Sequence, residues 1–170
     1  MSKSKILINS IDAFIFDFDG VLTNNKVLIN EKGEELVICS RADGLAFDVL
    51  KKLSKPSYII STEKNQVVRC RGKKLGIKVF QNVSNKPLTL KKLVKKEGYD
   101  LKKIFYIGND INDYKVMKIS GYTACPKDAH PIIKSISDFT LKTKGGDGVV
   151  RELIEKIIKI DLLKTLYSEV

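Results

Sequence analysis

Short apolar runs alternate along the chain with longer stretches in which apolar residues recur every three or four positions. The short runs are typical of buried strands, and the periodic stretches are typical of amphipathic helices. Strands are therefore expected at residues 11–18, 58–60, 77–80, 104–107, 122–125 and 139–141. Helices are expected from near Asp43 to just before Pro56, and at residues 65–75, 87–97, 112–119 and 149–160.

The alternation of strands and helices predicts a doubly wound α/β fold, in which helices cover both faces of a parallel sheet. A β-hairpin is expected as an insertion at about residues 25–39, because segments 26–30 and 36–39 flank a turn that contains Gly33. We expect a single domain over residues 1–170, a length that fits one substantial core.

Polar residues cluster at the carboxyl ends of three of the expected strands. They are Asp17 and Asp19, then Ser61 and Thr62, and finally Asn109, Asp110 and Asp113. Ligands of a parallel sheet bind beyond the carboxyl ends of its strands, so the fold would bring these three clusters together.

Asp17 and Asp19 lie two residues apart, just after a buried strand. Two carboxylates at one strand end repel each other unless they share a proton or a cation, and Mg²⁺ prefers such oxygen ligands. Asp17 could then attack phosphorus to form an aspartyl phosphate, while Asp19 donates a proton to the leaving oxygen and later activates water. Taken alone, the pair could equally be turn aspartates that cap the next element.

Ser61, Lys86 and segment 108–113 each have a structural interpretation as well as a functional one. Ser61 could bind a phosphate oxygen or cap a helix, and alone the cap is favoured. Lys86 taken alone is better interpreted as an ordinary surface lysine. The acids of segment 108–113 could bind a metal or cap a helix. All of these residues together, in this order along the chain, indicate a phosphate-transfer site far more specifically than any one of them does.

The ordered set resembles the four motifs of the haloacid dehalogenase superfamily of phosphotransferases. The matching residues are Asp17-Phe18-Asp19-Gly20-Val21-Leu22-Thr23, Ser61, Lys86 and Gly108-Asn109-Asp110-Ile111-Asn112-Asp113. Over residues 11–160 the chain is more closely similar to the small capless phosphatases that act on 3-deoxy-manno-octulosonate 8-phosphate, and to their relatives that act on nonulosonate 9-phosphates. The resemblance extends to residues 129–131 and 144–152.

The resemblance implies a role for each motif residue. Asp17 would be the nucleophile and a metal ligand, and Asp19 the general acid and base, whose main-chain carbonyl also binds the metal. Ser61 and Lys86 would hold the phosphate. The implied cofactor is Mg²⁺, and the position of Asn109 would supply a side-chain ligand.

The metal site departs from the family pattern at Asn109, because that position is usually an aspartate. A neutral amide is a weaker ligand than a carboxylate, so the metal affinity would fall unless Asp110 takes over. Asp110 and Asp113 would otherwise support the site.

The resemblance also implies residues that contact the substrate. Ser40, Asp43 and Gly44 match a substrate-contacting stretch, and Arg71 matches a substrate-binding arginine. Glu63, which follows the second motif, is expected at the same site.

Two further departures concern the substrate. Octulosonate phosphatases usually carry Gly-Arg after the second motif, where this chain has Thr62-Glu63, and another arginine position is Asp48. These changes remove positive charge. Segments 61–65 and 108–110 look more like phosphatase domains found with acylneuraminate cytidylyltransferases, so a nonulosonate 9-phosphate is favoured over an octulosonate 8-phosphate.

The resemblance implies a homotetramer, in which the hairpins form a central barrel and a neighbouring subunit completes each site. Without a cap, this neighbour would exclude water and select the substrate. The rival hypothesis is an inactive domain that serves as an assembly or regulatory partner of a cytidylyltransferase. Asn109 favours this rival, whereas the intact Asp17, Asp19, Ser61 and Lys86 favour the enzyme.

The composition narrows the possible partners and compartments. The chain carries a net charge of +11, but its lysines are spread along expected helices without interleaved aromatic residues, so an anionic small substrate is favoured over nucleic acid. Cys39, Cys70 and Cys125 are widely spaced and predict neither a zinc site nor disulfides. The sole histidine, His130, is expected to be structural. No apolar run predicts a membrane span or a signal peptide, so a cytoplasmic protein is expected.

Overall fold

The structure of the protein is a computed structural model that describes residues 6–167. Six strands form one parallel sheet in the order β5-β4-β1-β6-β7-β8. Their bounds are Ala13–Phe16 (β1), Ser57–Ile60 (β4), Lys78–Phe80 (β5), Ile104–Ile107 (β6), Tyr122–Cys125 (β7) and Phe139–Thr140 (β8). The strand order reverses direction at β1, which confirms the expected doubly wound α/β fold.

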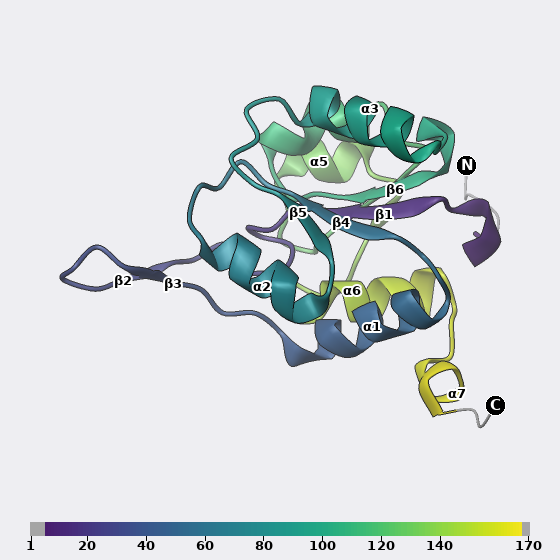
Figure 1. Ribbon diagram of the computed structural model, residues 1–170, viewed down its shortest axis with the longest axis horizontal. Coiled ribbons are helices and arrows are strands. Elements are labelled where there is room, and N and C mark those ends of the chain that lie inside the picture. The colour runs from purple at the N-terminus through teal and green to yellow at the C-terminus, as the bar shows by residue number, and fades with distance from the viewer. Residues whose placement is uncertain (1–5, 168–170) are drawn as a thin grey trace.

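Helices cover both faces of the sheet. The α-helices are α1 (Arg41–Lys52), α2 (Val67–Leu75), α3 (Lys86–Glu97), α4 (Tyr114–Met117), α5 (Pro131–Ile136), α6 (Val149–Glu152) and α7 (Leu162–Tyr167). Short 3-10 helices span Ile8–Ser10, Leu101–Lys103 and Ile111–Asp113, and a π-helix at Leu153–Ile157 continues α6. Figure 1 shows α3 and α5 on one face of the sheet and α1 and α6 on the other. Within residues 6–167, no helix is long and apolar enough to cross a membrane.

The central strand β1 contributes side chains to two buried cores. Phe14 and Phe16 belong to the core that includes residues of α1, α2 and α6, whereas Ala13 and Ile15 belong to the core shared with α3, α4 and α5. Successive side chains of a strand point to opposite faces, so a strand covered on both faces is apolar throughout. This explains the uninterrupted apolar run from Ala13 to Phe16.

The expected hairpin is present, but its paired segments are short. β2 (Leu28–Ile29) and β3 (Glu35–Leu36) pair antiparallel, against the expected segments 26–30 and 36–39. Gly33 lies in the connecting turn with φ +75°, a conformation that glycine adopts without strain. Figure 1 shows the hairpin projecting away from the sheet.

Two helices, α5 and α7, are not predicted by the sequence pattern. α5 is only six residues long and begins with Pro131, whose missing N–H is no loss at a helix start. Nδ1 of His130 accepts a hydrogen bond from the main-chain N–H of Ile132 at 3.2 Å. His130 therefore caps α5, in keeping with the structural role expected for it.

Candidate active site

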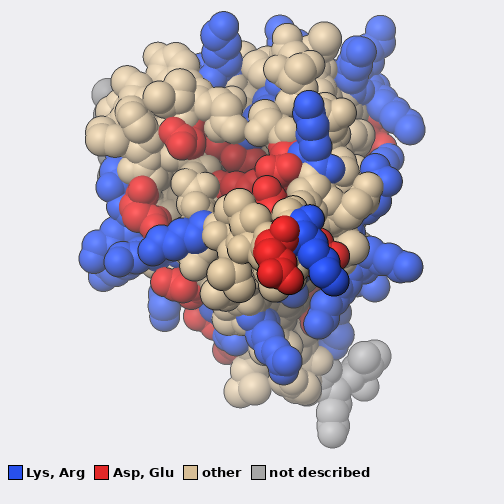
Figure 2. All heavy atoms as spheres, turned by 90° about the vertical axis from the view of Figure 1, so that its left-hand side faces the viewer, with Lys and Arg blue, Asp and Glu red and all other residues tan. Residues whose placement is uncertain are grey.

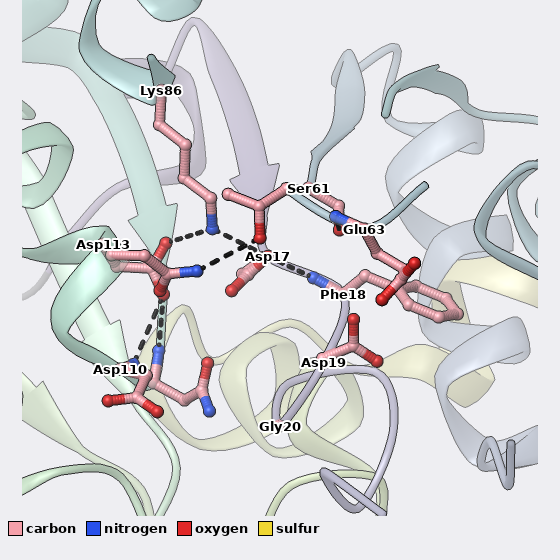
Figure 3. A network of polar contacts seen from close by, with 12 residues as sticks. Asp17, Phe18, Asp19, Gly20, Ser61, Glu63, Lys86, Asp110 and Asp113 are labelled. Atoms are coloured by element: carbon pink, nitrogen blue, oxygen red, sulfur yellow. Dashed lines mark hydrogen bonds and ion pairs between the residues drawn. The ribbon is translucent and has the colours of Figure 1, made fainter. Parts of the chain in front are cut away.

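The carboxyl ends of β1, β4 and β6 lie side by side, and each leads into the candidate site. Asp17 follows β1, Ser61 follows β4 and Gly108 follows β6. Lys86 reaches the same place from the first position of α3. Figure 3 shows Ser61, Lys86 and Asp113 around Asp17. The polar clusters therefore converge at one edge of the sheet.

Asp17 is the central carboxylate of this site and is 3% exposed. Its Oδ1 accepts a hydrogen bond from the main-chain N–H of Phe18 at 2.7 Å and pairs with Nζ of Lys86 at 2.9 Å. Burial raises the pKa of Asp17 to about 8, and the negative charge of Asp113 adds to this, while Lys86 opposes it. A nearby cation would therefore strongly favour the ionised carboxylate.

Lys86 is a buried member of the site and not a surface lysine, with only 2% of its surface exposed. Its Nζ lies 2.7 Å from Oδ1 of Asp113 and 2.9 Å from Oδ1 of Asp17. Burial lowers the pKa of Lys86, but the charges and hydrogen bonds of the two carboxylates outweigh this and raise it. Lys86 therefore keeps a positive charge beside Asp17.

Asp113 is fully buried and accepts hydrogen bonds on both carboxylate oxygens. Besides Lys86, Oδ1 accepts from the hydroxyl of Tyr106 at 2.9 Å. Oδ2 accepts from the main-chain N–H groups of Asn109 at 2.9 Å and Asp110 at 3.4 Å. Both oxygens of Asp113 are thus occupied in holding the segment after β6 and Lys86.

Asp19 follows Asp17 and remains partly exposed. The hydroxyl of Thr23 donates to its Oδ1 at 3.4 Å. Burial raises the pKa of Asp19, and the negative charge of Glu63 adds to the increase. The raised pKa favours the protonated carboxyl, which is the form that can donate a proton to a leaving oxygen.

Gly20 and Asn109 pack directly against each other. Gly20 has φ +77°, and a Cβ atom at this position would lie 1.9 Å from Nδ2 of Asn109, so only glycine fits. Asn109 is 7% exposed, and its Oδ1 is buried without a hydrogen-bond partner among residues 6–167. A buried amide oxygen left in this state costs free energy unless a ligand satisfies it.

These contacts fit a divalent cation. Oδ1 of Asn109 is available as a ligand, and Asp17 and Asp19 supply oxygens from the end of β1. Asp113 has no oxygen to spare, and Oδ1 of Asp110 already accepts from the main-chain N–H of Ile111 at 2.7 Å. The described residues hold no group of three His, Cys, Asp or Glu side chains arranged for a metal. A site here would instead combine carboxylate, amide and main-chain oxygens.

Three of the expected substrate residues, Ser40, Asp43 and Gly44, lie at the start of α1, and Arg71 lies on α2. The hydroxyl of Ser40 accepts from the main-chain N–H of Ala42 at 3.1 Å, and the Ser40 carbonyl accepts from the Arg71 guanidinium at 2.7 Å. Arg71 and Gly44 line a cavity of about 280 Å³. The other lining residues are Arg41, Asp48, Lys74 and Leu75.

Asp43 is expected from the sequence to contact the substrate, but in the structure it is buried away from the cavity. Its side chain is only 1% exposed, and its Oδ1 accepts from the main-chain N–H groups of Val150 at 2.8 Å and Arg151 at 3.1 Å. The carboxylate therefore caps the start of α6 and does not face the cavity or solvent.

Glu63 takes part in the loop after β4. Its Oε1 accepts from the main-chain N–H groups of Lys64 at 2.6 Å and Asn65 at 2.7 Å. Figure 3 shows the Glu63 carboxylate on the same side of Asp17 as Asp19. The loop after β4 thus brings an acidic side chain toward Asp19 (Figure 3).

Tyr106 is a buried polar residue of the site that the sequence analysis missed. It lies within β6, whose other three residues are apolar, so the strand pattern gave no reason to single it out. Burial raises the pKa of Tyr106 well above its usual value, and the negative charges of Asp113 and Asp17 add to this. The phenol therefore remains a hydrogen-bond donor.

Figure 2 shows the end of the molecule that carries the hairpin. Acidic side chains gather near the centre of this face, and lysine and arginine side chains lie around them. The whole chain has a net charge of +11, so this acidic centre is a negatively charged area on a protein that is positively charged overall. Such a centre favours a cation at the site, and the surrounding positive charge favours the approach of an anionic substrate.

Comparison with known proteins identifies related hydrolases. Residues 47–153 match the family model of haloacid dehalogenase-like hydrolases. The chain is 30% identical over 150 residues to the 3-deoxy-D-manno-octulosonate 8-phosphate phosphatase of Escherichia coli (strain K12), and the match covers 88% of this chain and 80% of that protein.

Two solved structures share the fold over nearly the whole chain. A protein from Streptomyces avermitilis assigned to the HAD hydrolase family is 34% identical with a TM-score of 0.90, covering 94% of this chain and 91% of that one. The 3-deoxy-D-manno-octulosonate 8-phosphate phosphatase of Moraxella catarrhalis, solved with magnesium, phosphate and KDO, is 30% identical with a TM-score of 0.83, covering 92% and 87%. The chain therefore belongs to the haloacid dehalogenase-like hydrolases and is homologous to the capless octulosonate phosphatases among them.

Proposed function

We propose that the protein is a magnesium-dependent phosphatase that hydrolyses the phosphomonoester of a 2-keto-3-deoxy sugar acid through an aspartyl phosphate on Asp17. The observation that carries this proposal is the buried Asp17 carboxylate, which Lys86 and the main-chain N–H of Phe18 hold by the same oxygen. Because both contacts use Oδ1, Oδ2 is left to attack phosphorus.

In the first half of the reaction, Oδ2 of Asp17 bonds to phosphorus as the bond to the sugar oxygen breaks. Asp19 gives its proton to that oxygen, and the dephosphorylated sugar acid leaves. In the second half, Asp19 takes a proton from water as the water oxygen attacks phosphorus, which releases orthophosphate and restores Asp17. The Lys86 ammonium and the Ser61 hydroxyl hold phosphoryl oxygens during both steps.

The residues that would hold Mg²⁺ are Asp17 through its carboxylate, Asp19 through its main-chain carbonyl and Asn109 through Oδ1, with Asp110 as a further candidate. The bound ion would neutralise phosphoryl oxygens that gain charge during transfer. Asn109 adds an oxygen but no negative charge, so the protein would bind Mg²⁺ less tightly than one with aspartate at this position.

A nonulosonate 9-phosphate is the favoured substrate, and 3-deoxy-D-manno-octulosonate 8-phosphate is the second candidate. The relatives from Escherichia coli and Moraxella catarrhalis carry the name of the octulosonate enzyme. Glu63 instead brings negative charge close to Asp19. A carboxylate there can accept hydrogen bonds from sugar hydroxyls but would repel an acidic group. Arg41, Arg71 and Lys74 around their cavity offer positive charge for the substrate's own carboxylate.

We infer that the working form is a homotetramer built on the hairpins, with a neighbouring subunit completing each site. The support is the exposure of large apolar side chains on this segment. Their exposed fractions are 50% for Val27, 68% for Leu28, 60% for Ile29, 59% for Leu36 and 70% for Ile38. A two-stranded hairpin is marginally stable alone, and an apolar patch of this kind favours association.

A second candidate function rests on Asn109. If its amide binds Mg²⁺ too weakly for catalysis, the domain would act as an assembly or regulatory partner of a cytidylyltransferase that uses the sugar acid. This candidate predicts no phosphate release at any Mg²⁺ concentration.

Phosphate release separates the two candidates. We expect Mg²⁺-dependent release from a nonulosonate 9-phosphate, slower release from 3-deoxy-D-manno-octulosonate 8-phosphate and little from an ordinary hexose phosphate. Asp17→Asn should lower kcat by at least about 1,000-fold, because an amide oxygen is not a nucleophile at phosphorus. Circular dichroism checks that the variant is folded. Turnover that survives Asp17→Asn, or no turnover of any sugar acid phosphate by the native protein, would contradict the proposal.

A further inference from the structure

Tyr106 is the large buried side chain that links the hydrophobic core to the catalytic lysine. It is fully buried in the same core as Ile15, Leu90 and Val116, on the face covered by α3 and α4. A phenol hydroxyl in such surroundings costs free energy unless it finds a hydrogen-bond partner. Here that partner belongs to the candidate active site.

Three short contacts connect Tyr106 to the nucleophile. The Tyr106 hydroxyl donates to Oδ1 of Asp113 at 2.9 Å. The same oxygen lies 2.7 Å from Nζ of Lys86, which lies 2.9 Å from Oδ1 of Asp17. All four residues are 3% exposed or less, so water does not weaken these interactions.

We propose that Tyr106 is a positioning residue for phosphoryl transfer, acting on Lys86 through Asp113. This inference rests on the proposed phosphatase function. By donating to Oδ1 of Asp113, the phenol satisfies part of the negative charge on the same oxygen that pairs with Lys86. The ammonium group then remains shared between Asp113 and Asp17, where it can also reach a phosphoryl oxygen.

Removal of the phenol hydroxyl therefore changes how strongly Lys86 is held by Asp113 relative to Asp17. In Tyr106→Phe, Oδ1 of Asp113 keeps Lys86 as its one remaining partner and attracts it more strongly. Lys86 moves toward Asp113, and its interaction with Asp17 and the phosphoryl group weakens. Small displacements of a charged group at the reacting centre affect the transition state more than substrate binding.

Tyr58 supplies a matched control within the same core. It lies on β4, is 7% exposed, and its hydroxyl lies 3.0 Å from the hydroxyl of Tyr99. Tyr58→Phe thus also removes one hydroxyl and one hydrogen bond from this core, and the partner it loses is Tyr99 instead of a residue of the candidate site. Tyr106→Phe is expected to lose more thermal stability than Tyr58→Phe, because Tyr106 donates to a buried carboxylate whereas Tyr58 pairs with a neutral hydroxyl.

Steady-state kinetics tests the proposal. We expect Tyr106→Phe to lower kcat by about tenfold with KM changed by less than about twofold, and Tyr58→Phe to leave both within about twofold of the native values. In the background of Asp113→Asn, Tyr106→Phe should have little further effect, because the residue acts through Asp113. A kcat for Tyr106→Phe within twofold of native, or an equal loss in Tyr58→Phe, would overturn the proposal.

A second measurement does not need turnover. The buried ammonium group of Lys86 should give a side-chain NMR signal in protein labelled with ¹⁵N-lysine, assigned by its loss in Lys86→Arg. Tyr106→Phe should shift this signal and Tyr58→Phe should not. If the native protein hydrolyses no sugar acid phosphate, the proposed function fails, and the Lys86 signal still decides whether Tyr106 controls the lysine. An unchanged signal in Tyr106→Phe contradicts the inference.

Discussion

Asn109 sets the charge of the candidate metal site at the scale of a single residue. Its Oδ1 is buried without a partner, while its Nδ2 fills the space that Gly20 leaves open. We expect Asn109→Asp to lower the Mg²⁺ concentration for half-maximal phosphate release by about tenfold, because a carboxylate binds this ion more strongly than an amide. Calorimetric titration with Mg²⁺ should give the same direction. An unchanged or higher Mg²⁺ requirement would show that Asn109 is not a ligand.

Asp110→Asn is the matched control for this substitution. It alters the neighbouring residue by the same exchange of carboxylate and amide, and it keeps an oxygen that can accept from the main-chain N–H of Ile111. If Asn109 is the ligand, Asp110→Asn leaves the Mg²⁺ requirement within about twofold of native. If Asp110 has taken over, this variant raises the requirement instead.

The sequence predicts a residue of the candidate site when its side-chain chemistry suits the site and its position places it at the end of a strand. Asp17, Ser61 and Asn109 follow strands that meet at one sheet edge, so topology alone brings them together. Tyr106 could not be found in this way, because its function depends on where the end of a core side chain lies. Asp43 fitted a substrate-contacting stretch by position, yet the fold uses its carboxylate to cap α6.

At the scale of secondary structure, the Asp43 cap makes the stability of α6 and its neighbours depend on pH. Burial raises the pKa of Asp43 from 3.8 to about 6, although the main-chain N–H groups of Arg151 and Val150 oppose the shift. A folded-state pKa above the unfolded value means that the protonated form is the better stabiliser. This contribution is complete below about pH 4 and is lost as the pH rises through about 6.

Asp43→Asn tests this dependence, since the amide can accept the same hydrogen bonds but cannot ionise. Relative to the native protein, its free energy of unfolding in urea should rise between about pH 4 and about pH 7.5, by at most about 3 kcal/mol. Asp43→Ala, which removes the cap, should be less stable than native by about 1–2 kcal/mol at about pH 4. A stability difference between Asp43→Asn and native that does not vary with pH would refute the cap's proposed ionisation.

The helices and strands themselves were predictable to different degrees. Gly76 and Gly98 end α2 and α3 in left-handed conformations, as glycine placement indicates. The expected helix at 112–119 is instead a 3-10 turn followed by four α-helical residues, because Asp113 accepts the main-chain N–H groups of Asn109 and Asp110 and tightens the chain. Six-residue helices such as α5 are too short for their periodicity to be recognised.

At the scale of the whole molecule, the apolar hairpin has no partner within residues 6–167 that would cover it. Leu28 and Leu36 are directly paired across β2 and β3, so their side chains share one face. They are 68% and 59% exposed. Burying such pairs from several subunits would supply the hydrophobic contribution that the isolated hairpin lacks, at roughly 25 cal/mol for each Å² of apolar surface removed from water.

The combined substitution of Leu28→Glu and Leu36→Glu tests whether this face holds the tetramer together. We expect the native protein to elute as a tetramer in light-scattering chromatography and the double variant as a monomer, because the introduced carboxylates would lie against one another in the interface. The single substitution Leu163→Glu is a control, since Leu163 is 72% exposed but lies on α7. If a neighbouring subunit completes each site, the monomer should also lose at least about tenfold in kcat/KM for the sugar acid phosphate. A stable monomer with native activity would show that one chain excludes water and selects its substrate unaided.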